Sequence, residues 1–409
     1  MRKLLTLTAL ASLLATPSYA QDDVESLRAQ IRQLHEQMAR LQARLAELEA
    51  KKGVGAKAVT GVKSPIKIYG KIKLDAIYDT HNMGTDAFIT KLPLRDRDDR
   101  STFNMKDTRI GFIINGPEAD GWKVTGRVEA DFYGLGGNSD NGALRIRLSY
   151  INLNNGHGTN IRIGQDYIPI ASQMASTLDF LSMGASGNLW DRVAQITVTQ
   201  SFESGFGIVG TVWKSSATTD HVGMRMPWVG AKLFYKGDAL GTGKPLYVAL
   251  GGAYRQGSDE VDGVKDDVTD YLVAFEWNIP FNLFFPMAVK GEAYYAQGLT
   301  SRDFLVFTDP HYLEGSSVEE VETKGGFIQL SLKPFQKVSF NLGTGMNDPD
   351  DDYAKATGNY KKNWRAFGNV IYKLAPNVSF GFEVDHQETL YEGTVEHGER
   401  YIASAIYLW

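Results

Sequence analysis

Residues 67–79 read KIYGKIKLDAIYD, and the alternation within this stretch decides the fold class of the chain. One set of alternate positions is apolar, namely Ile68, Ile72, Leu74, Ala76 and Tyr78. The other set is charged, namely Lys67, Lys71, Lys73, Asp75 and Asp79. Because successive side chains of a β-strand point to opposite faces, the stretch predicts a strand with one apolar and one charged face.

The same period of two recurs in about fifteen further segments between residue 107 and the end of the chain. Short turns such as NNGHG (154–158) follow the even-numbered segments. The odd-numbered segments are mostly followed by longer connections, as at 80–106, 167–191 and 298–323. Short turns at one end and long loops at the other are typical of an outer-membrane barrel. We therefore predict an all-β transmembrane barrel of about 16 antiparallel strands.

The placement of aromatic and charged residues distinguishes this barrel from a soluble β-sandwich, which also alternates. Aromatic side chains stand near the ends of the apolar faces, as at Tyr401 and Trp409, where the two membrane interfaces select them. Charges such as Arg127 and Arg365 fall mid-strand on the other face, where a packed core would leave them without solvation. No internal apolar run approaches the roughly 18 residues of a membrane-spanning helix.

The segments before the barrel are of a different kind. Residues 1–20 combine a basic start, a short apolar run and a small-x-small ending, which predicts a signal peptide cleaved after Ala20. Residues 21–49 carry apolar residues at alternating steps of three and four, which predicts an N-terminal α-helical coiled coil and therefore an oligomer. Residues 50–65 have the composition of a flexible linker, and the barrel is expected over residues 66–409.

The order of these parts resembles the DcaP-like trimeric porins of the Gram-negative outer membrane, and the resemblance covers nearly the whole chain. Its densest stretches are LRIRLSYINLNNGHGTNIRIGQDYIP (144–169) and STLDFLSMGASGNLWDRVAQITVTQ (176–200). Asp166 and Tyr167 depart from the Thr-Trp or similar pair that follows Gly-Gln in the family. The resemblance implies a homo-trimeric channel for small anionic solutes in the outer membrane, with the coiled coil in the periplasm.

Enzymatic and cofactor chemistry finds no support in the sequence. The seven histidines are scattered, and no paired-histidine metal motif, Walker loop or Gly-x-Ser-x-Gly elbow occurs. The chain has no cysteine, and DPDDD (348–352) lacks the ligand spacing of a calcium loop, so a solvated acidic loop is expected there. With a formal net charge of −5, we expect no nucleic-acid partner, and we also expect no enzyme activity, cofactor or metal.

On the charged face, basic residues outnumber acidic ones over the first five strands. Parity assigns to the inner wall nine basic residues and about six acidic ones, the acidic ones being Asp75, Asp79, Asp107, Glu129, Asp131 and Asp166. Two of the basic residues are Lys67 and Lys123, and the seven expected to line a pore are Lys71, Lys73, Arg109, Arg127, Arg145, Arg147 and Arg162. Arginine keeps its charge and offers a planar fork to carboxylates, so we predict that these residues line a pore and bind small anionic solutes such as dicarboxylates. The alternative is that they pair with loop carboxylates and only brace the wall.

The connection near 167–191 is the expected constriction. It contains Gly184 and Gly187 for folding back and few charges beyond Asp179 and Asp191. Irregular backbone is permitted inside a barrel where water can solvate it. The leading function is a passive diffusion channel, and the alternative is a structural or adhesive outer-membrane barrel with a plugged lumen.

Overall fold

The computed structural model describes residues 65–137, 142–214, 226–301 and 304–409. The signal peptide, the coiled coil and nearly all of the linker that the sequence predicts lie outside these residues. Within the four described ranges, no helix is long and apolar enough to cross a membrane.

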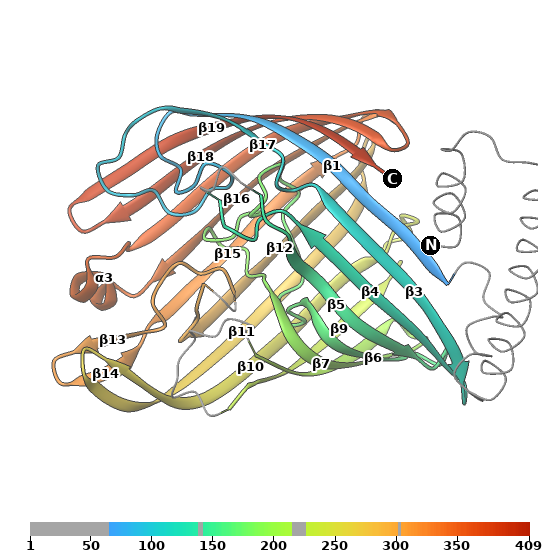
Figure 1. Cartoon of the computed structure of the whole chain (residues 1–409), viewed down its shortest axis with the longest axis horizontal. Coiled ribbons are helices and arrows are strands. Elements are labelled where there is room, and N and C mark those ends of the chain that lie inside the picture. The colour runs from blue at the N-terminus through green and yellow to red at the C-terminus, as the bar shows by residue number, and fades with distance from the viewer. Residues whose placement is uncertain (1–64, 138–141, 215–225, 302–303) are drawn as a thin grey trace, which may run out of the picture. The chain divides into compact units, whose positions relative to one another are not determined.

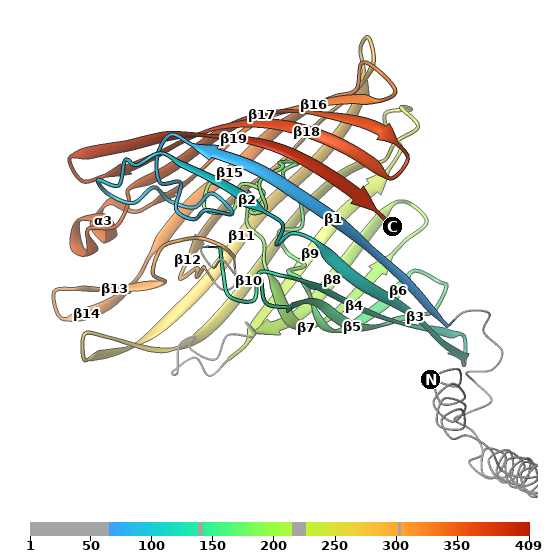
Figure 2. The same cartoon turned by 45° about the horizontal axis from the view of Figure 1, so that its top comes forward.

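The described residues form a closed antiparallel barrel (Figures 1 and 2). Its strands are β1 (Ile66–Asp79), β2 (Arg100–Asn104), β3 (Arg109–Ala119), β4 (Trp122–Asp131), β5 (Arg145–Asn154), β6 (Thr159–Tyr167), β7 (Arg192–Ser201), β8 (Phe206–Lys214), β9 (Trp228–Gly237), β10 (Leu246–Val261), β11 (Val264–Asn282), β12 (Pro286–Gln297), β15 (Glu322–Leu332), β16 (Val338–Pro349), β17 (Lys362–Ala375), β18 (Val378–Tyr391) and β19 (Thr394–Leu408). A hairpin of β13 (His311–Glu314) and β14 (Ser317–Glu320) and the helix α3 (Asp351–Thr357) lie between barrel strands.

The sheet closes because β1 pairs with β19, from Lys71↔Leu408 to Asp79↔Arg400. β2 and β3 both pair with β1, one beyond the other, so they occupy one position in the wall. The seventeen described strands of the sheet therefore fill sixteen positions around the barrel, as the alternation predicts. One prediction needs correction: the connection expected over 80–106 contains strand β2, because the wall continues across the break at residues 105–108.

The two ends of the barrel differ as the sequence predicts. Short turns lie at one end, on the right of Figure 1, which we call the turn end. The connections 80–99, 132–144, 168–191 and 298–310 leave the strands at the opposite end, which we call the loop end. The turn between β10 and β11 is short, yet these strands run to residues 261 and 264 and so extend the wall at the loop end.

The two faces of the wall follow the parity of the sequence. In β1, Ile72, Leu74 and Tyr78 are exposed on the outer face, whereas Lys73 and Asp75 are buried on the inner face. Exposed apolar side chains are poorly solvated by water. Their position on the outer face suits contact with the hydrocarbon of a bilayer. Inner charges become buried because they pair with one another and with segments folded into the lumen, as described below.

The last strand explains how the chain can end on an aromatic residue. Trp409 and Gly70 exchange two backbone hydrogen bonds, with N···O distances of 3.0 and 3.1 Å. A Cβ atom at position 70 would lie 2.7 Å from the Trp409 ring, so glycine is required for this approach. The terminal residue is thereby held in the wall by β1.

One side of the lumen is filled by an apolar core. Inward-facing residues of β8 to β12 pack against Ile168 and Ile170 from the connection after β6 and against Phe304 and Val306 from the segment after β12. The rings of Trp213 and Trp228 stack at the centre, with centroids 5.8 Å apart. This core therefore fills part of the lumen beside β8 to β12.

The hairpin β13–β14 is fastened to the extended tip of β10 and β11 by one histidine. Nδ1 of His311 lies 2.7 Å from an oxygen of Asp259, and Nε2 lies 2.9 Å from an oxygen of Asp270. Arg255 also donates to Asp270, at 2.9 Å. Only the protonated imidazole can donate to both carboxylates. Burial lowers the pKa of His311, but the hydrogen bonds to Asp259 and Asp270 and their charges outweigh it and raise the pKa to about 9.

We expect the hairpin to detach from the barrel at alkaline pH. The His311 pKa is raised from 6.5 to about 9, so the stabilisation, about 3 kcal/mol, is complete below pH 6.5 and is lost as pH rises through about 9. Hydrogen exchange of the hairpin amides should therefore accelerate between pH 7 and pH 9 beyond the intrinsic base-catalysed rate. In a His311→Gln variant the excess acceleration should vanish. An identical pH profile in the variant would contradict the charged bridge.

Candidate functional site

The seven basic residues predicted to line the wall come together on one continuous stretch of it. They stand on β1 (Lys71, Lys73), β3 (Arg109), β4 (Arg127), β5 (Arg145, Arg147) and β6 (Arg162). Lys71 pairs directly with Arg109 in the register of β1 and β3. The pairing of neighbouring strands therefore brings residues that are scattered in the sequence together on one basic inner wall.

Arg147 is the most deeply bound of the seven. Its Nε lies 2.9 Å from an oxygen of Glu129, its Nη1 lies 2.8 Å from an oxygen of Asp131, and its Nη2 donates to the hydroxyl of Tyr167. The side chain is 1% exposed. All three nitrogen atoms of its guanidinium group therefore have partners within the protein, and Arg147 braces the wall.

Lys73 is also used within the protein. Its Nζ lies 2.9 Å from an oxygen of Asp75 and donates to the carbonyl oxygen of Leu178 at 2.6 Å. The side chain is 4% exposed. Lys73 therefore binds the wall to the connection after β6.

The other five side chains remain open to the lumen. Arg109, Arg127, Arg145 and Arg162 are 25–35% exposed, and Lys71 is 19% exposed. Each is paired with a wall carboxylate: Lys71 and Arg109 with Asp107, Arg127 with Glu129, Arg145 with Asp131, and Arg162 with Asp166. A guanidinium group has five N–H donors, so one carboxylate leaves donors available.

The balance of charge on this wall is positive. Apart from Asp79, which pairs with Arg400 on β19, the seven basic residues face five carboxylates, namely Asp75, Asp107, Glu129, Asp131 and Asp166. The partners come from the wall itself, whereas the sequence suggested carboxylates from loops as the alternative. The excess of two positive charges is held in a space bounded by protein, where fields are screened less than in open solution.

Two cavities border the basic wall. The larger, about 490 Å³, is lined by Arg109, Arg127 and Arg162, and on the far side by Ser172 and Lys232. The smaller, about 150 Å³, lies between Lys71, Arg109 and Arg147 on the wall and the segment from Thr177 to Phe180. Arg109 borders both cavities. Of the predicted residues only Arg145 lines neither cavity.

Residues 168–191, which we call the inward loop, cross from β6 to the opposite wall and are fastened there by three buried glutamates. Glu276 on β11 accepts hydrogen bonds from the backbone N–H groups of Ser172 and Gln173. Glu292 on β12 accepts from the N–H of Leu189, and Glu383 on β18 accepts from two further N–H groups of the loop. The carboxyl oxygens of these glutamates satisfy backbone N–H groups that strands cannot pair.

The inward loop also contacts the far wall closely enough to require glycine. Gly187 adopts a φ of +98°, and a Cβ atom there would lie 2.0 Å from the carbonyl oxygen of Gly326 on β15. Gly187 therefore serves both the turn and the close approach. The prediction that Gly187 allows the chain to fold back agrees with this geometry.

Sequence reasoning missed several charged residues of the lumen. Lys232 on β9, Lys290 on β12 and Arg400 on β19 point inward by the same parity, but they lie beyond the first five strands, to which the prediction of a basic wall is confined. Lys232 binds Glu276 at 3.1 Å, and Lys290 donates to the carbonyl oxygen of Met174 at 2.6 Å. Alternation along each strand identifies the inward face of these residues, but it does not identify their partners.

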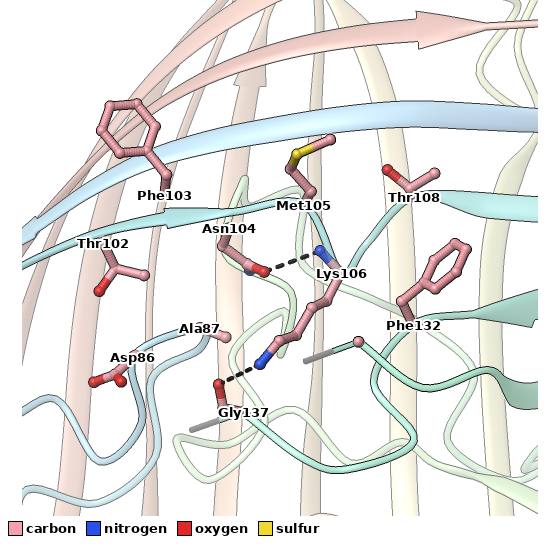
Figure 3. Close-up of a pocket in the computed structure, with 11 residues that line it drawn as sticks. Asp86, Ala87, Thr102, Phe103, Asn104, Met105, Lys106, Thr108, Phe132 and Gly137 are labelled. Atoms are coloured by element: carbon pink, nitrogen blue, oxygen red, sulfur yellow. Dashed lines mark hydrogen bonds between the residues drawn. The ribbon is translucent and has the colours of Figure 1, made fainter. Parts of the chain in front are cut away.

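A further cavity, about 530 Å³, lies where the wall breaks between β2 and β3 (Figure 3). Phe103, Met105 and Phe132 line it, and Lys106 reaches across to donate to the carbonyl oxygen of Gly137 at 3.0 Å. Phe103 and Met105 are exposed, with outward parity. None of the seven predicted basic residues lines this cavity, so it is separate from the basic wall.

The acidic stretch at 348–352 has a structural use. Asp350 caps α3: one of its carboxylate oxygens accepts from the N–H of Tyr353 at 2.6 Å, and the other accepts from the N–H of Glu322 at 3.1 Å. Within the described ranges, no group of three or more His, Cys, Asp or Glu side chains is arranged to hold a metal ion.

Comparison with known proteins agrees with this architecture. Residues 20–204 match the family model described as DcaP outer membrane protein. The solved structure of the outer membrane channel DcaP of Acinetobacter baumannii superposes with a TM-score of 0.72 at 25% identity, covering 84% of this chain and 97% of that chain. The chain is DcaP-like.

Other solved structures share the fold of this DcaP-like chain. The anion-selective porin from Comamonas acidovorans has a TM-score of 0.58 at 13% identity, covering 84% of this chain and 99% of that one. The trimer form of OmpT from Vibrio cholerae has a TM-score of 0.50 at 14% identity, with the same coverage. No curated protein matches the chain. The DcaP-like chain is thus an outer-membrane protein with a porin barrel.

Proposed function

We propose that the chain is a passive diffusion channel of the outer membrane that prefers small anionic solutes, among them dicarboxylates. The observation that carries the proposal is the row of partly exposed arginines along the two cavities. Rings of arginine and lysine are how pores favour anions. The Comamonas acidovorans porin of the same fold, described as anion-selective, supports the same reading.

The arrangement suits a solute with two carboxylates. Arg127 on β4 and Arg162 on β6 stand two strands apart, which separates their backbones by about 10 Å. Their long side chains project into the same 490 Å³ cavity. Each retains donors beyond its wall carboxylate, so each can bind one carboxylate of a short dicarboxylate. Arg109, which borders both cavities, would receive the solute as it enters the constriction formed by the inward loop.

A second candidate function rests on the apolar core. Because that core fills the lumen beside β8 to β12, a structural or adhesive barrel with a plugged lumen is the competing proposal. Single-channel recording in planar bilayers separates the two, because only a channel gives discrete conductance steps in the absence of other proteins.

Assembly into a homo-trimer is part of the proposal. Its support is the coiled coil expected over residues 21–49, placed in the periplasm, and the trimer form recorded for the Vibrio cholerae OmpT barrel. Mass measurement of the folded protein in detergent tests the subunit number. Deleting residues 22–49 should leave the barrel folded, because its strand pairing closes within residues 66–409.

Selectivity is the direct test of the proposed function. The wild-type channel should favour chloride over potassium in a salt gradient, as measured by reversal potential. Replacing Arg127 and Arg162 by glutamate should lower the chloride-to-potassium permeability ratio several-fold, because four units of charge change beside the larger cavity. Lys355→Glu, on the exposed surface of α3, is the matched control and should change the ratio little. A wild-type channel that favours potassium would overturn the proposal.

A further inference from the structure

The inward loop carries a single carboxylate between residues 168 and 190, and that carboxylate is held away from the passage. The residue is Asp179, which belongs to the segment lining the smaller cavity opposite Arg147. Its side chain is nevertheless completely buried. An acidic group in this segment would be expected to face the basic wall, so its burial needs a cause.

The cause is a set of four donors, two for each carboxylate oxygen. Oδ1 of Asp179 accepts from Nη1 of Arg365 at 3.3 Å and from the N–H of Leu181 at 3.0 Å. Oδ2 accepts from Nη1 of Arg400 at 3.4 Å and from the N–H of Ile89 at 3.0 Å. Each oxygen of the carboxylate therefore already has two donors within the protein.

The two arginines are held in place by carboxylates of the wall. Arg365 on β17 binds Asp385 on β18 at 2.7 Å, and Arg400 on β19 binds Asp79 on β1 at 2.6 Å. Both guanidinium groups are fully buried, so neither lines the passage. Nη1 of each arginine donates to Asp179, and Nη2 of Arg400 also donates to the carbonyl oxygen of Thr85 at 2.7 Å. The main chain of the same residue is fixed separately, because Glu383 accepts from its N–H at 2.9 Å.

We propose that Arg365 and Arg400 determine the charge selectivity of the channel by sequestering the Asp179 carboxylate away from the passage. This inference rests on the proposed function. The basic wall exceeds its own carboxylates by two charges, so one free carboxylate at the edge of the 150 Å³ cavity would cancel half of the excess. Arg365 and Arg400 are specificity-determining residues that act through Asp179 and do not touch the solute.

The test releases Asp179 without changing the net charge. Arg365→Gln with Asp385→Asn, and Arg400→Gln with Asp79→Asn, each remove one positive and one negative group. We call the variant that carries all four substitutions the released background. Its chloride-to-potassium permeability ratio should fall by about twofold or more, because the Asp179 carboxylate can rotate toward the cavity. Adding Asp179→Asn should restore the wild-type ratio. Asp179→Asn in the otherwise native chain should change the ratio much less.

This cycle separates the inference from the proposed function. A wild-type channel that does not favour chloride contradicts the proposed function before the cycle begins. In a chloride-selective channel, an equal effect of Asp179→Asn in both backgrounds would show that the carboxylate already faces the passage, and it would overturn the inference alone. If the four-substitution background does not fold, the single charge-neutral pair Arg400→Gln with Asp79→Asn gives the same comparison.

A second readout distinguishes release of one side chain from detachment of the whole loop. The chain has no cysteine, so a Ser186→Cys substitution introduces one thiol, at a loop position that is fully buried against the far wall. Labelling of this thiol by a charged reagent should be equally slow in the native and released backgrounds, since Glu383 still holds the loop. Faster labelling in the released background would assign the arginines a purely structural role and overturn the inference.

Discussion

Replacing Ile196 by arginine is expected to destabilise the folded barrel in a bilayer by about 2–4 kcal/mol. Ile196 lies in the middle of β7 with outward parity and is 56% exposed. Its strand neighbours Ile163 and Val212 are also exposed and apolar, so together they form part of the lipid-facing band. A guanidinium group placed there would lie in the hydrocarbon of the bilayer and would lose its hydrating water. The free energy of unfolding in phospholipid vesicles, measured by urea titration, checks the magnitude.

The matched control for this prediction is Thr199→Arg on the same strand. Thr199 has inward parity and lines the 490 Å³ cavity, so an arginine there can reach water. Its cost should be well below that of Ile196→Arg. Equal costs at the two positions would mean that the register of β7 is wrong by one residue, because a one-residue slip exchanges the two faces.

Replacing Glu383 by alanine should release the inward loop from β18. Glu383 is fully buried and accepts from the N–H of Leu178 at 2.6 Å, from the N–H of Asp179 at 2.9 Å and from Asn369 at 2.8 Å. Each buried donor that loses its acceptor costs about 1–3 kcal/mol. We expect the amides of Leu178 and Asp179 to exchange faster with solvent and the single-channel conductance to rise, because the loop no longer narrows the lumen.

Glu388→Ala is the control on the same strand. Glu388 points outward, is about half exposed and contacts His386, so its removal leaves no buried backbone donor unpaired. Conductance and amide exchange in the inward loop should remain as in the wild type. Unchanged conductance in Glu383→Ala would contradict the assignment of this glutamate as an anchor of the inward loop.

The sequence predicted the wall of the barrel well because the signal for a strand is local. Alternation with a period of two located all sixteen wall positions and assigned the faces of β1 correctly. The elements that were not predicted are those too short to show a clear periodic pattern. Strand β2 was placed within a connection, because RSTFN contains too few residues to show alternation. The strands of the hairpin β13–β14 are likewise too short to show alternation, and the seven residues of α3 are too few to show helical periodicity.

The candidate site was predictable only in part. Parity placed Arg109, Arg127 and Arg162 on the inner face, and the structure places them beside a common cavity. Parity could not distinguish these open side chains from Arg147, whose guanidinium group is consumed by Glu129 and Asp131. That distinction depends on which carboxylates stand opposite in the strand register, and a single sequence does not specify the register.

The sequence alone therefore determined which residues face lipid and which face the lumen, since side-chain direction follows from strand geometry within each segment. Only the tertiary structure decided where the inward loop ends and which charges it conceals. Leu178 meets Glu383 across a separation of 205 residues, and Asp179 meets Arg400 across 221. Such contacts arise when the barrel closes and brings distant strands around one lumen, and no local pattern in either segment encodes its partner.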